Sequence, residues 1–464
     1  MRIQIGIGRF HRAHEALYVH ELLLQGELNY GICGICILPF DEQIYSALKK
    51  QGGKYHIIER GNDGETVKSV ESIVDLIFGY ENPVAAFDKL AHVDVKIVTF
   101  TVTEAGYFYD CSTKELNFEH EAIMHDLAHP DTPHTLYGYL LRGLTLRRER
   151  GLPPFTVQSC DNVQGNGDLV KHLFLQFCAR ANAEIVSWIK SNVAFPNSMV
   201  DRITPGGSAE ELRYVNDTLM LADAVPVTCE PYRQWVIEDN YCNGRPDWTA
   251  VGVQLTTSVK PYEKIKVRLL NAGHSALGYT GYLLAHSTVD EACNDHLLAK
   301  YLRKFFEEVS VTLDPVPGMN IVDYQSTLIK RFSNASIKDQ IWRICKDGSS
   351  KIPGFIMPTA RELISSGQSV ETITFLLASY IHFLQRCLAD HHNDVSAAID
   401  DPERSRLADA VGHAAGNAKL FASKCSFMFA EQELTNDAFM ESIQSHFDDI
   451  SENGVRAVIE KMLS

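Results

Sequence analysis

The first half of the chain alternates short apolar runs with amphipathic stretches, and this alternation constrains the fold more than any other feature. Apolar runs of strand length occupy residues 3–7, 32–38, 95–101 and 155–159. Helical periodicity occupies residues 13–24, 42–50, 136–150 and 169–181. Such an order is typical of a parallel sheet with crossover helices. Residues 55–70 predict a hairpin with Gly61-Asn-Asp-Gly64 at its tip.

The pattern changes near Pro261, where a succession of amphipathic helices begins. Loops are expected at residues 315–317 and 346–351. The 464 residues suffice for two or three domains with buried cores. We therefore expect an α/β domain over residues 1–258 and a mainly helical domain over residues 259–464.

Charge and hydropathy exclude several classes of partner. The formal net charge is −16, and the isoelectric point near 5.6 argues against a nucleic-acid partner. No apolar run approaches the roughly 20 residues needed to cross a bilayer. The start of the chain, Met1-Arg2, leads into a strand without a secretory signal. We expect a cytoplasmic protein without a membrane or nucleic-acid partner.

The 11 cysteines are scattered and odd in number, which favours reduced thiols over a disulfide framework. One Cys-x-x-Cys occurs, at Cys33 and Cys36. It lies in a strand-like run, where these positions point to opposite faces, and no second pair matches it. We expect no metal there, and we interpret His11 and His14 as structural.

A two-glycine motif follows the first strand. Gly6 and Gly8 would permit a tight turn and the close approach of a pyrophosphate to a helix N-terminus. His11 stands where the usual fingerprint has a third glycine. Asp41 ends the second strand, where a carboxylate can accept hydrogen bonds from a ribose and repel a 2′-phosphate, or can cap the next helix. The motif favours a nucleotide, with NAD over NADP.

A mainly apolar run in the second half of the chain carries the polar side chains Lys266, Asn271 and His274. On an α-helix at about 100° per residue they share an arc of about 140°, and Glu263 falls inside it. Oxidising an alcohol needs a base, donors to the developing alkoxide and a group that orients the carbinol. These side chains could serve those roles. The alternatives are that Lys266 is a solvated surface lysine, that His274 is structural and that Asn271-Ala-Gly is a helix break.

Asn162 lies just past the fourth apolar run. Ligands of open α/β sheets bind beyond the carboxyl ends of strands, and an amide there can donate a hydrogen bond to a bound oxygen. A turn role for Asp161 and Asn162 is the competing interpretation.

The chain resembles the polyol-specific long-chain dehydrogenases over almost its whole length. The blocks that carry the resemblance in the first half are Gly6-x-Gly8-x-Phe10-His11-Arg12-Ala13-His14, Thr101-Val-Thr103-Glu104-Ala-Gly106-Tyr107, Ser159-Cys160-Asp161-Asn162 with Asn166-Gly167, and residues 195–203. Those in the second half are Cys229-Glu230-Pro231-Tyr232-x-Gln234-Trp235, the Lys266 segment, Arg331-Phe332-Ser333-Asn334 and Asp347-Gly348-Ser349-Ser350-Lys351.

The resemblance implies a metal-independent, NAD-linked enzyme with a doubly wound Rossmann-type N-terminal domain, a mainly α-helical C-terminal domain and an active site between them. It implies that Lys266 is the general base, that Asn162 and Asn271 bind the alkoxide oxygen, that His274 orients the hydroxyl and that Glu263 gates the proton. Asp201, Arg343 and Lys351 would contact the other substrate hydroxyls. The implied cofactor contacts are Gly6, Gly8, Phe10, Arg12, Asp41, Thr103 and Glu104.

Lysine is ordinarily protonated, with a pKa of about 10.4, so a base role requires burial or a nearby cation. Reversible oxidation of D-mannitol to D-fructose is the leading expectation. D-Arabinitol or D-sorbitol oxidation, hexuronate (fructuronate or mannonate) chemistry and a non-catalytic nucleotide-binding role are the alternatives. Phe40 stands where related mannitol enzymes tend to carry a second acid, which leaves the rejection of NADP less strict. We expect a monomer or weak oligomer.

Overall fold

A five-stranded parallel sheet organises the first part of the protein, and the computed structural model describes residues 1–110, 113–392, 394–414 and 416–464. The strand order is β5-β2-β1-β6-β7. Its strands are β1 (Arg2–Ile5), β2 (Ile32–Cys36), β5 (Ile73–Phe78), β6 (Ile97–Phe100) and β7 (Thr156–Ser159). The four predicted strands are confirmed, and the edge strand β5 was not predicted. The order reverses at β1, which begins the chain and lies in the middle of the sheet, as the Rossmann-type fold requires.

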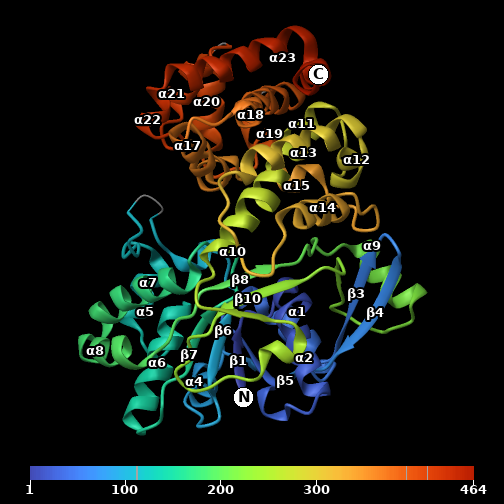
Figure 1. Ribbon diagram of the computed structural model, residues 1–464. Helices are drawn as coiled ribbons and strands as arrows, with labels where there is room; N and C mark the ends of the chain where they lie inside the picture. Colours follow the sequence, from blue (N-terminus) through green and yellow to red (C-terminus); the bar gives the residue numbers. More distant parts are fainter. Residues whose placement is uncertain (111–112, 393, 415) are drawn as a thin grey trace. The chain divides into compact units, whose positions relative to one another are not determined.

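Helices cover both faces of this sheet (Figure 1). One apolar core joins Ile3, Ile5 and Cys33 to the helices that follow β5, and a second core joins Cys36 and Leu76 to the helices near the start of the chain. The helices of this part are α1 (Arg9–Ala13), α2 (Glu15–Leu24), α3 (Glu42–Lys50), α4 (Pro83–Leu90), α5 (Glu121–Ala128), α6 (Leu136–Glu149), α7 (Asn166–Ala181), α8 (Ala183–Asn192) and α9 (Ala209–Arg213). Burial on both faces explains why the strands are continuous apolar runs.

The prediction of one helix over residues 13–24 is wrong in its first turn. The helical run begins earlier, at Arg9, and is interrupted at His14, whose φ of −116° and ψ of −87° separate α1 from α2. The predicted hairpin is confirmed, because β3 (Tyr55–Gly61) and β4 (Gly64–Val70) pair antiparallel with Gly61 opposite Gly64.

Two small sheets complete the N-terminal part. In one, β3 also pairs parallel with β9 (Val227–Cys229). In the other, β10 (Gln234–Glu238) pairs antiparallel with β8 (Ser198–Asp201) and parallel with β11 (Gln254–Thr256). The remaining short turns of this part are η1 (Leu28–Tyr30), η2 (Pro39–Asp41), η3 (Glu104–Tyr107), η5 (Trp248–Val251) and the π-helical η4 (Tyr214–Thr218).

The chain divides into two compact units, Met1–Lys260 and Pro261–Ser464. Among its described residues, the named elements of the second unit are all helices or helical turns. Its elements are α10 (Lys260–Ile265), η6 (Lys266–Asn271), α11 (Ala272–Leu283), α12 (Val289–Asn294), α13 (His296–Ser310), α14 (Ile321–Phe332), α15 (Ile341–Cys345), α16 (Gly348–Lys351), η7 (Ile352–Ile356), α17 (Met357–Ser365), α18 (Glu371–Asp390), α19 (Val395–Ala398), α20 (Arg404–Ala414), α21 (Ala418–Lys424), α22 (Glu431–Leu434) and α23 (Asp437–Leu463), which is kinked at Gly454. The α/β fold with a mainly helical C-terminal part is confirmed.

The second unit packs around two largely buried helices, α11 and α18. All the large apolar side chains of α18 are buried, and this helix contacts α11, α13 and α23. The expected loop over residues 346–351 is wrong in its second half, because Gly348–Lys351 forms a helical turn. Within the described ranges, no helix is both long enough and apolar enough to span a membrane.

Candidate active site

The glycine loop after β1 is held from one side and open on the other. Gly6 has a φ of 81°, and a Cβ there would lie 2.5 Å from the carbonyl oxygen of Thr101. The carbonyl of Gly6 accepts hydrogen bonds from the Thr101 hydroxyl at 3.0 Å and the Gln4 amide at 2.7 Å. A Cβ on Gly8 would meet no heavy atom within 4 Å in the described chain. The loop is therefore fixed in a shape that only glycine at position 6 permits, and its Gly8 side can be approached closely.

Arg12 supports this loop from behind. Its guanidinium donates to the Ile7 carbonyl at 3.1 Å and to the Val225 carbonyl, and it lies over the Tyr55 ring at 5.4 Å. Burial lowers its pKa to about 10. Phe10 stacks on His14 with ring centroids 5.1 Å apart. Arg12 therefore holds the glycine loop through the Ile7 carbonyl, whereas Phe10 packs on the junction between α1 and α2.

Asp41 lies in η2, directly after β2 and Leu38. Its carboxylate accepts a hydrogen bond from the Leu38 amide at 3.3 Å, and burial raises its pKa. Asp41 occupies the N-cap position of α3, as the helix-cap interpretation expects, but within the described residues its side chain makes no hydrogen bond to that helix. The carboxylate bonds the amide at the start of η2 instead. Its neighbour Phe40 is 75% exposed.

Thr103 and Glu104 follow β6 and are exposed. Thr103 has a φ of 61°, a conformation that a β-branched residue adopts only under constraint. The buried carboxylate of Asp161 supplies the constraint, since it accepts hydrogen bonds from the Val102 and Thr103 amides at 3.2 and 2.9 Å and from the Tyr107 hydroxyl at 3.2 Å. Burial raises the pKa of Asp161 to about 6. The sequence indicates only a turn role for Asp161, because the amides that it binds are distant along the chain.

Asn162 is exposed in the turn after β7, next to this carboxylate. Asn166 ties that turn to the start of β8, because its amide donates to the Asp161 carbonyl at 3.0 Å and to the Ser198 carbonyl at 2.8 Å. Asp201, at the other end of β8, is 3% exposed. The N-terminal unit therefore builds Asn162 and Asp201 into one hydrogen-bonded frame.

In the C-terminal unit, the Lys266 segment is not the α-helix that the sequence predicts. Lys266–Asn271 is a π-helical stretch between α10 and α11. A π-helix bonds residue i to i+5, so Asn271 lies one turn above Lys266 and closer to its side than on an α-helix. Glu263 precedes Lys266 by one turn of α10, and His274 follows Asn271 by one turn of α11. The four residues lie on successive turns, and Lys266 and Glu263 are each 8% exposed.

The imidazole of His274 lies among cations. Burial, and then the charges of Arg343, Arg331, Lys351 and Lys266, hold its pKa well below the usual value. Its ring stacks on Phe332 with centroids 4.3 Å apart. Its buried Nε2 makes no hydrogen bond to any residue that the structure describes. The result is an imidazole that is held in its neutral form.

Arg343 and Lys351 are both fixed by their surroundings. Arg343 forms a bidentate pair with the buried carboxylate of Asp339, four residues earlier. The Lys351 ammonium donates to the Ile344 carbonyl at 3.1 Å. The structure thus brings Lys266, His274, Arg343 and Lys351 together.

Arg331 and Phe332 belong to this cluster as well, and sequence analysis gave them no role. Both are buried at the end of α14. Their place in the Arg331-Phe332-Ser333-Asn334 block was the available signal, but apolar periodicity alone predicts a packed helix end there.

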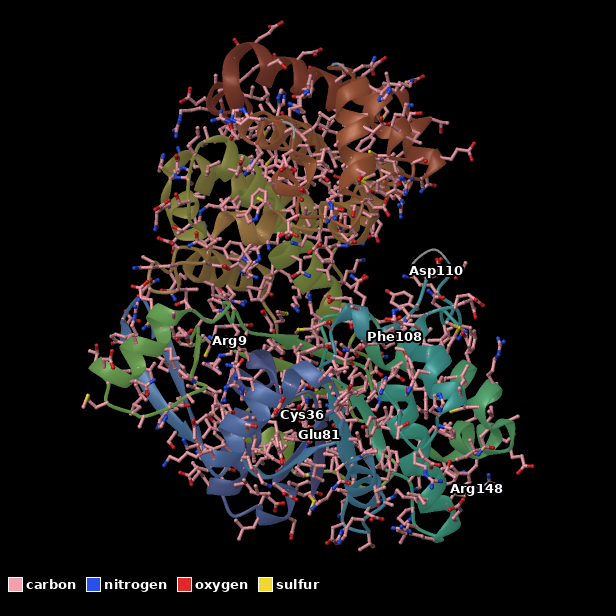
Figure 2. The ribbon with its side chains drawn as sticks, turned by 180° about the vertical axis from the view of Figure 1, so that it is seen from behind. Arg9, Cys36, Glu81, Phe108, Asp110 and Arg148 are labelled. Carbon is pink, nitrogen blue, oxygen red and sulfur yellow. The ribbon has the colours of Figure 1, made fainter. Side chains whose placement is uncertain are left out.

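Cys33 and Cys36 point into the two opposite cores of the sheet, as predicted (Cys36 is labelled in Figure 2). Burial raises the pKa of Cys33 to about 12. The ten cysteines that the structure describes are free thiols, and Cys111 lies outside the described residues. No group of three His, Cys, Asp or Glu side chains suited to a metal ion occurs in the ranges described.

Family models match nearly the whole chain. The model described as mannitol dehydrogenase Rossmann domain matches residues 1–250. The model described as mannitol dehydrogenase C-terminal domain matches residues 258–451. The chain belongs to the mannitol dehydrogenase family.

Curated members of the mannitol dehydrogenase family are similar over their full length. Mannitol 2-dehydrogenase of Neosartorya fischeri is 39% identical over 99% of this chain and 92% of the relative. A mannitol dehydrogenase of Saccharomyces cerevisiae is 36% identical over the same shares.

Two solved structures share the fold. Pseudomonas fluorescens mannitol 2-dehydrogenase, in ternary complex with NAD and D-mannitol, matches with a TM-score of 0.87 and 38% identity, over 100% of this chain and 94% of that one. A substrate-free D-sorbitol dehydrogenase matches with a TM-score of 0.86 and 32% identity, over 99% and 94%. The two similar structures are thus named for dehydrogenases of two different hexitols, mannitol and sorbitol.

Proposed function

We propose that this protein is an NAD-dependent polyol dehydrogenase that reversibly oxidises D-mannitol to D-fructose, with the cluster around His274 as the substrate-binding part of its site. The observation that carries the proposal is the buried Lys266 one π-turn from Asn271, beside an imidazole that is held neutral. The full-length similarity to mannitol 2-dehydrogenases supports it.

Lys266 is the proposed general base. His274 lies close to several cations and has a strongly lowered pKa, so its neutral imidazole is a poor acceptor of the hydroxyl proton. A different group must take that proton, and Lys266, buried one π-turn from Asn271, is the proposed one. Glu263, one turn away, is suited to pass the proton to solvent.

His274 and the asparagines would position and stabilise the reacting oxygen. The unpaired Nε2 of His274 would hydrogen-bond the substrate hydroxyl and orient the carbinol. The amides of Asn271 and Asn162 would donate to the same oxygen as negative charge develops on it, the role that a metal ion plays in other alcohol dehydrogenases. Asp201, Arg343 and Lys351 would bind the remaining hydroxyls.

The N-terminal unit fits a dinucleotide. Gly8 leaves open space where a pyrophosphate would approach, and Asp41 places a half-buried carboxylate at the end of β2 for a ribose. Phe10, Arg12, Thr103 and Glu104 lie in the segments that frame the glycine loop. When bound, NAD supplies the hydride acceptor that the oxidation requires.

A second candidate is a hexuronate oxidoreductase. Arg343, Arg331 and Lys351 all contribute positive charge at His274, and fixed cations favour a carboxylate. Their partners Asp339 and Asp347 offset part of that charge, which favours a neutral polyol.

Initial rates on D-mannitol, D-arabinitol, D-sorbitol and D-mannonate, each with NAD and with NADP, test these alternatives. We expect the highest kcat/KM for D-mannitol with NAD, and a weak but measurable rate with NADP because Phe40 carries no charge. A preference for mannonate would replace the polyol proposal with the hexuronate one. Tight NADH binding without any turnover would indicate a non-catalytic protein.

Cytoplasmic location and a monomeric or weakly associating state remain sequence predictions. Light scattering on the purified protein over a range of concentrations tests the second.

A further inference from the structure

The segment Asp347–Lys351 is held in an unusual shape by residues from behind it. Asp347 adopts a left-handed conformation with a φ of 56°. A Cβ on Gly348 would lie 2.6 to 2.8 Å from ring and hydroxyl atoms of Tyr380, so this position admits only glycine. Lys351 follows within a single helical turn, and its amide donates to the Asp347 carbonyl at 2.9 Å. The direction of the Lys351 side chain therefore depends on how this turn is anchored.

Asp401 provides the anchor. Its carboxylate accepts hydrogen bonds from the Ser349 amide at 2.9 Å and from the Ser349 hydroxyl at 2.6 Å. It also accepts one from the Glu403 amide at 2.8 Å, which fixes the carboxylate itself. Asp401 is 4% exposed. A buried carboxylate with three donors is a strong and directional contact, because charged hydrogen bonds are strengthened away from water.

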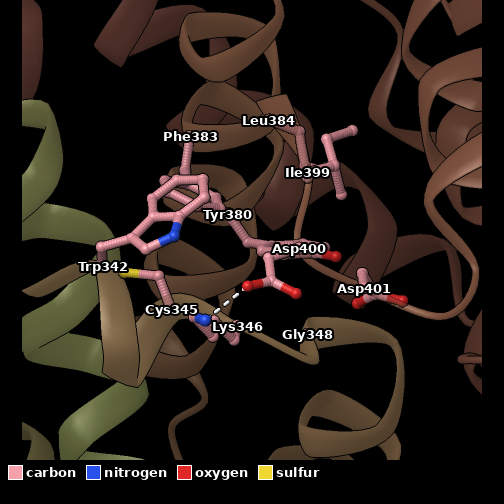
Figure 3. Close-up of a pocket in the computed structure, with 10 residues that line it drawn as sticks. All are labelled: Trp342, Cys345, Lys346, Gly348, Tyr380, Phe383, Leu384, Ile399, Asp400 and Asp401. Atoms are coloured by element: carbon pink, nitrogen blue, oxygen red, sulfur yellow. Dashed lines mark ion pairs between the residues drawn. The ribbon is translucent and has the colours of Figure 1, made fainter. Parts of the chain in front are cut away.

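The neighbouring Asp400 makes a different contact. Its side chain is 53% exposed and pairs with the Lys346 ammonium at 2.5 Å, beside the small pocket in Figure 3. The same figure shows Asp401 and Gly348 on that pocket with Tyr380. Of the two adjacent carboxylates, Asp400 therefore forms a surface ion pair, whereas Asp401 forms the buried anchor.

We propose that Asp401 is a positioning residue for substrate binding, which acts by anchoring Ser349 and thereby the turn that presents Lys351. This inference rests on the proposed polyol dehydrogenase function and goes beyond it, since Asp401 is 50 residues from Lys351 in sequence and is not itself a substrate contact.

The electrostatics agree with this geometry. Burial lowers the pKa of Lys351, and the Arg343 charge adds to this effect. The carboxylates of Asp347 and Asp401 and the Cys345 thiol oppose it. The ammonium also donates to the Ile344 carbonyl and lies near the imidazole of His274. Removing the Asp401 charge would therefore also make the Lys351 ammonium easier to deprotonate.

The test is a double-mutant cycle on the full-length enzyme, with Asp401→Asn, Lys351→Met and the double variant. We expect Asp401→Asn to raise the KM for D-mannitol about tenfold while kcat changes less than about threefold, because the loss is in substrate positioning. With Lys351→Met already present, Asp401→Asn should raise KM less than about twofold further, since both changes remove the same interaction. NADH affinity, measured by fluorescence titration, should not change.

Asp400→Asn is the matched control, with an expected KM within about twofold of the wild type. If Asp401→Asn fails to fold, Ser349→Ala removes one of the anchor's donors and should raise KM about threefold, and Ser349→Thr should restore it.

The outcomes separate the two proposals. A wild-type enzyme without activity on any polyol overturns the proposed function and this inference with it. An active wild type in which Asp401→Asn leaves KM unchanged, or raises it by the same factor with and without Lys351, overturns the anchoring role alone.

Discussion

The imidazole of His274 stacks on the ring of Phe332, with centroids 4.3 Å apart and planes inclined by 28°. Phe332 is 2% exposed and ends α14, so a rigid apolar surface fixes one face of the imidazole. The contact limits rotation of the ring and contributes to the burial that keeps it neutral.

We therefore expect Phe332→Leu to lower kcat/KM for D-mannitol about tenfold, because the hydroxyl is held less firmly. Steady-state kinetics with active-site titration by NADH measure this effect. Phe305→Leu, at a buried aromatic residue of α13, is the control and should lower thermal stability without changing kcat/KM per active site. Equal losses of kcat/KM in both variants would assign the effect of Phe332 to general packing.

The lowered pKa of His274 predicts which group determines the pH profile. Because the imidazole is already neutral throughout the working range, its ionisation should not appear in kcat/KM for polyol oxidation. The wild-type profile should rise with pH to a plateau as the proposed base, Lys266, loses its proton. His274→Gln should lower the plateau by about 100-fold and keep the rise at the same pH. Loss of the rise in that variant would make His274 the base.

Substituting the two glycines of the first loop should have different effects, on stability for Gly6 and on NADH affinity for Gly8. Gly6→Ala should destabilise the protein by roughly 2–4 kcal/mol, because the φ of 81° and the Thr101 carbonyl oxygen leave no room for a Cβ. Gly8→Ala should change the unfolding free energy by less than about 0.5 kcal/mol and weaken NADH binding at least about tenfold, because its Cβ would fill only the space left for the cofactor. Urea unfolding and NADH titration distinguish them, and unchanged NADH affinity in Gly8→Ala would remove the loop from the cofactor site.

The buried His14 predicts how stability depends on pH. Its Nε2 donates to the Gln234 carbonyl at 2.9 Å, and burial lowers its pKa to about 3. The unfolded chain, with an ordinary histidine pKa near 6.5, binds a proton first on acidification. Its contribution to stability is therefore complete above about pH 6.5 and is lost as pH falls toward 3.

Between pH 8 and pH 4.5, His14 should account for about 2–3 kcal/mol of the decrease in unfolding free energy. Urea unfolding over this range should give a smaller decrease for His14→Gln, and an unaltered one for His92→Gln, whose side chain is 49% exposed. If both variants showed the wild-type slope, the pKa of His14 would be the same in the folded and the unfolded protein.

The fold was largely predictable from the sequence. The strands of the parallel sheet are buried on both faces, so each one stands out as a continuous apolar run, and the Gly61–Gly64 tip identifies the hairpin. The edge strand β5 contains the exposed Val74 and the half-exposed Asp75, and it therefore lacks that signal. Strands β8 to β11 are short, and they pair with partners that are distant in sequence, which local periodicity cannot predict.

The sequence indicates which residues form the candidate site, but it does not predict their backbone conformation or the contacts that hold them. The spacing of Lys266, Asn271 and His274 indicated one functional segment, but a hydrophobic period of 3.6 residues does not reveal a π-helical stretch. The roles of Asp161 and Asp401 depend on contacts with amides that are 58 and 52 residues away. Only the folded chain brings those groups together.

The proposed mechanism requires the Lys266 amine to take the hydroxyl proton. The most direct measurement is the kcat of Lys266→Ala for D-mannitol, with and without added methylamine, in a protein whose NADH affinity is verified. We predict a loss of at least about 1,000-fold, with NADH binding retained and partial rescue that increases with the concentration of the neutral amine. A kcat within a few-fold of the wild type would show that Lys266 is not the base.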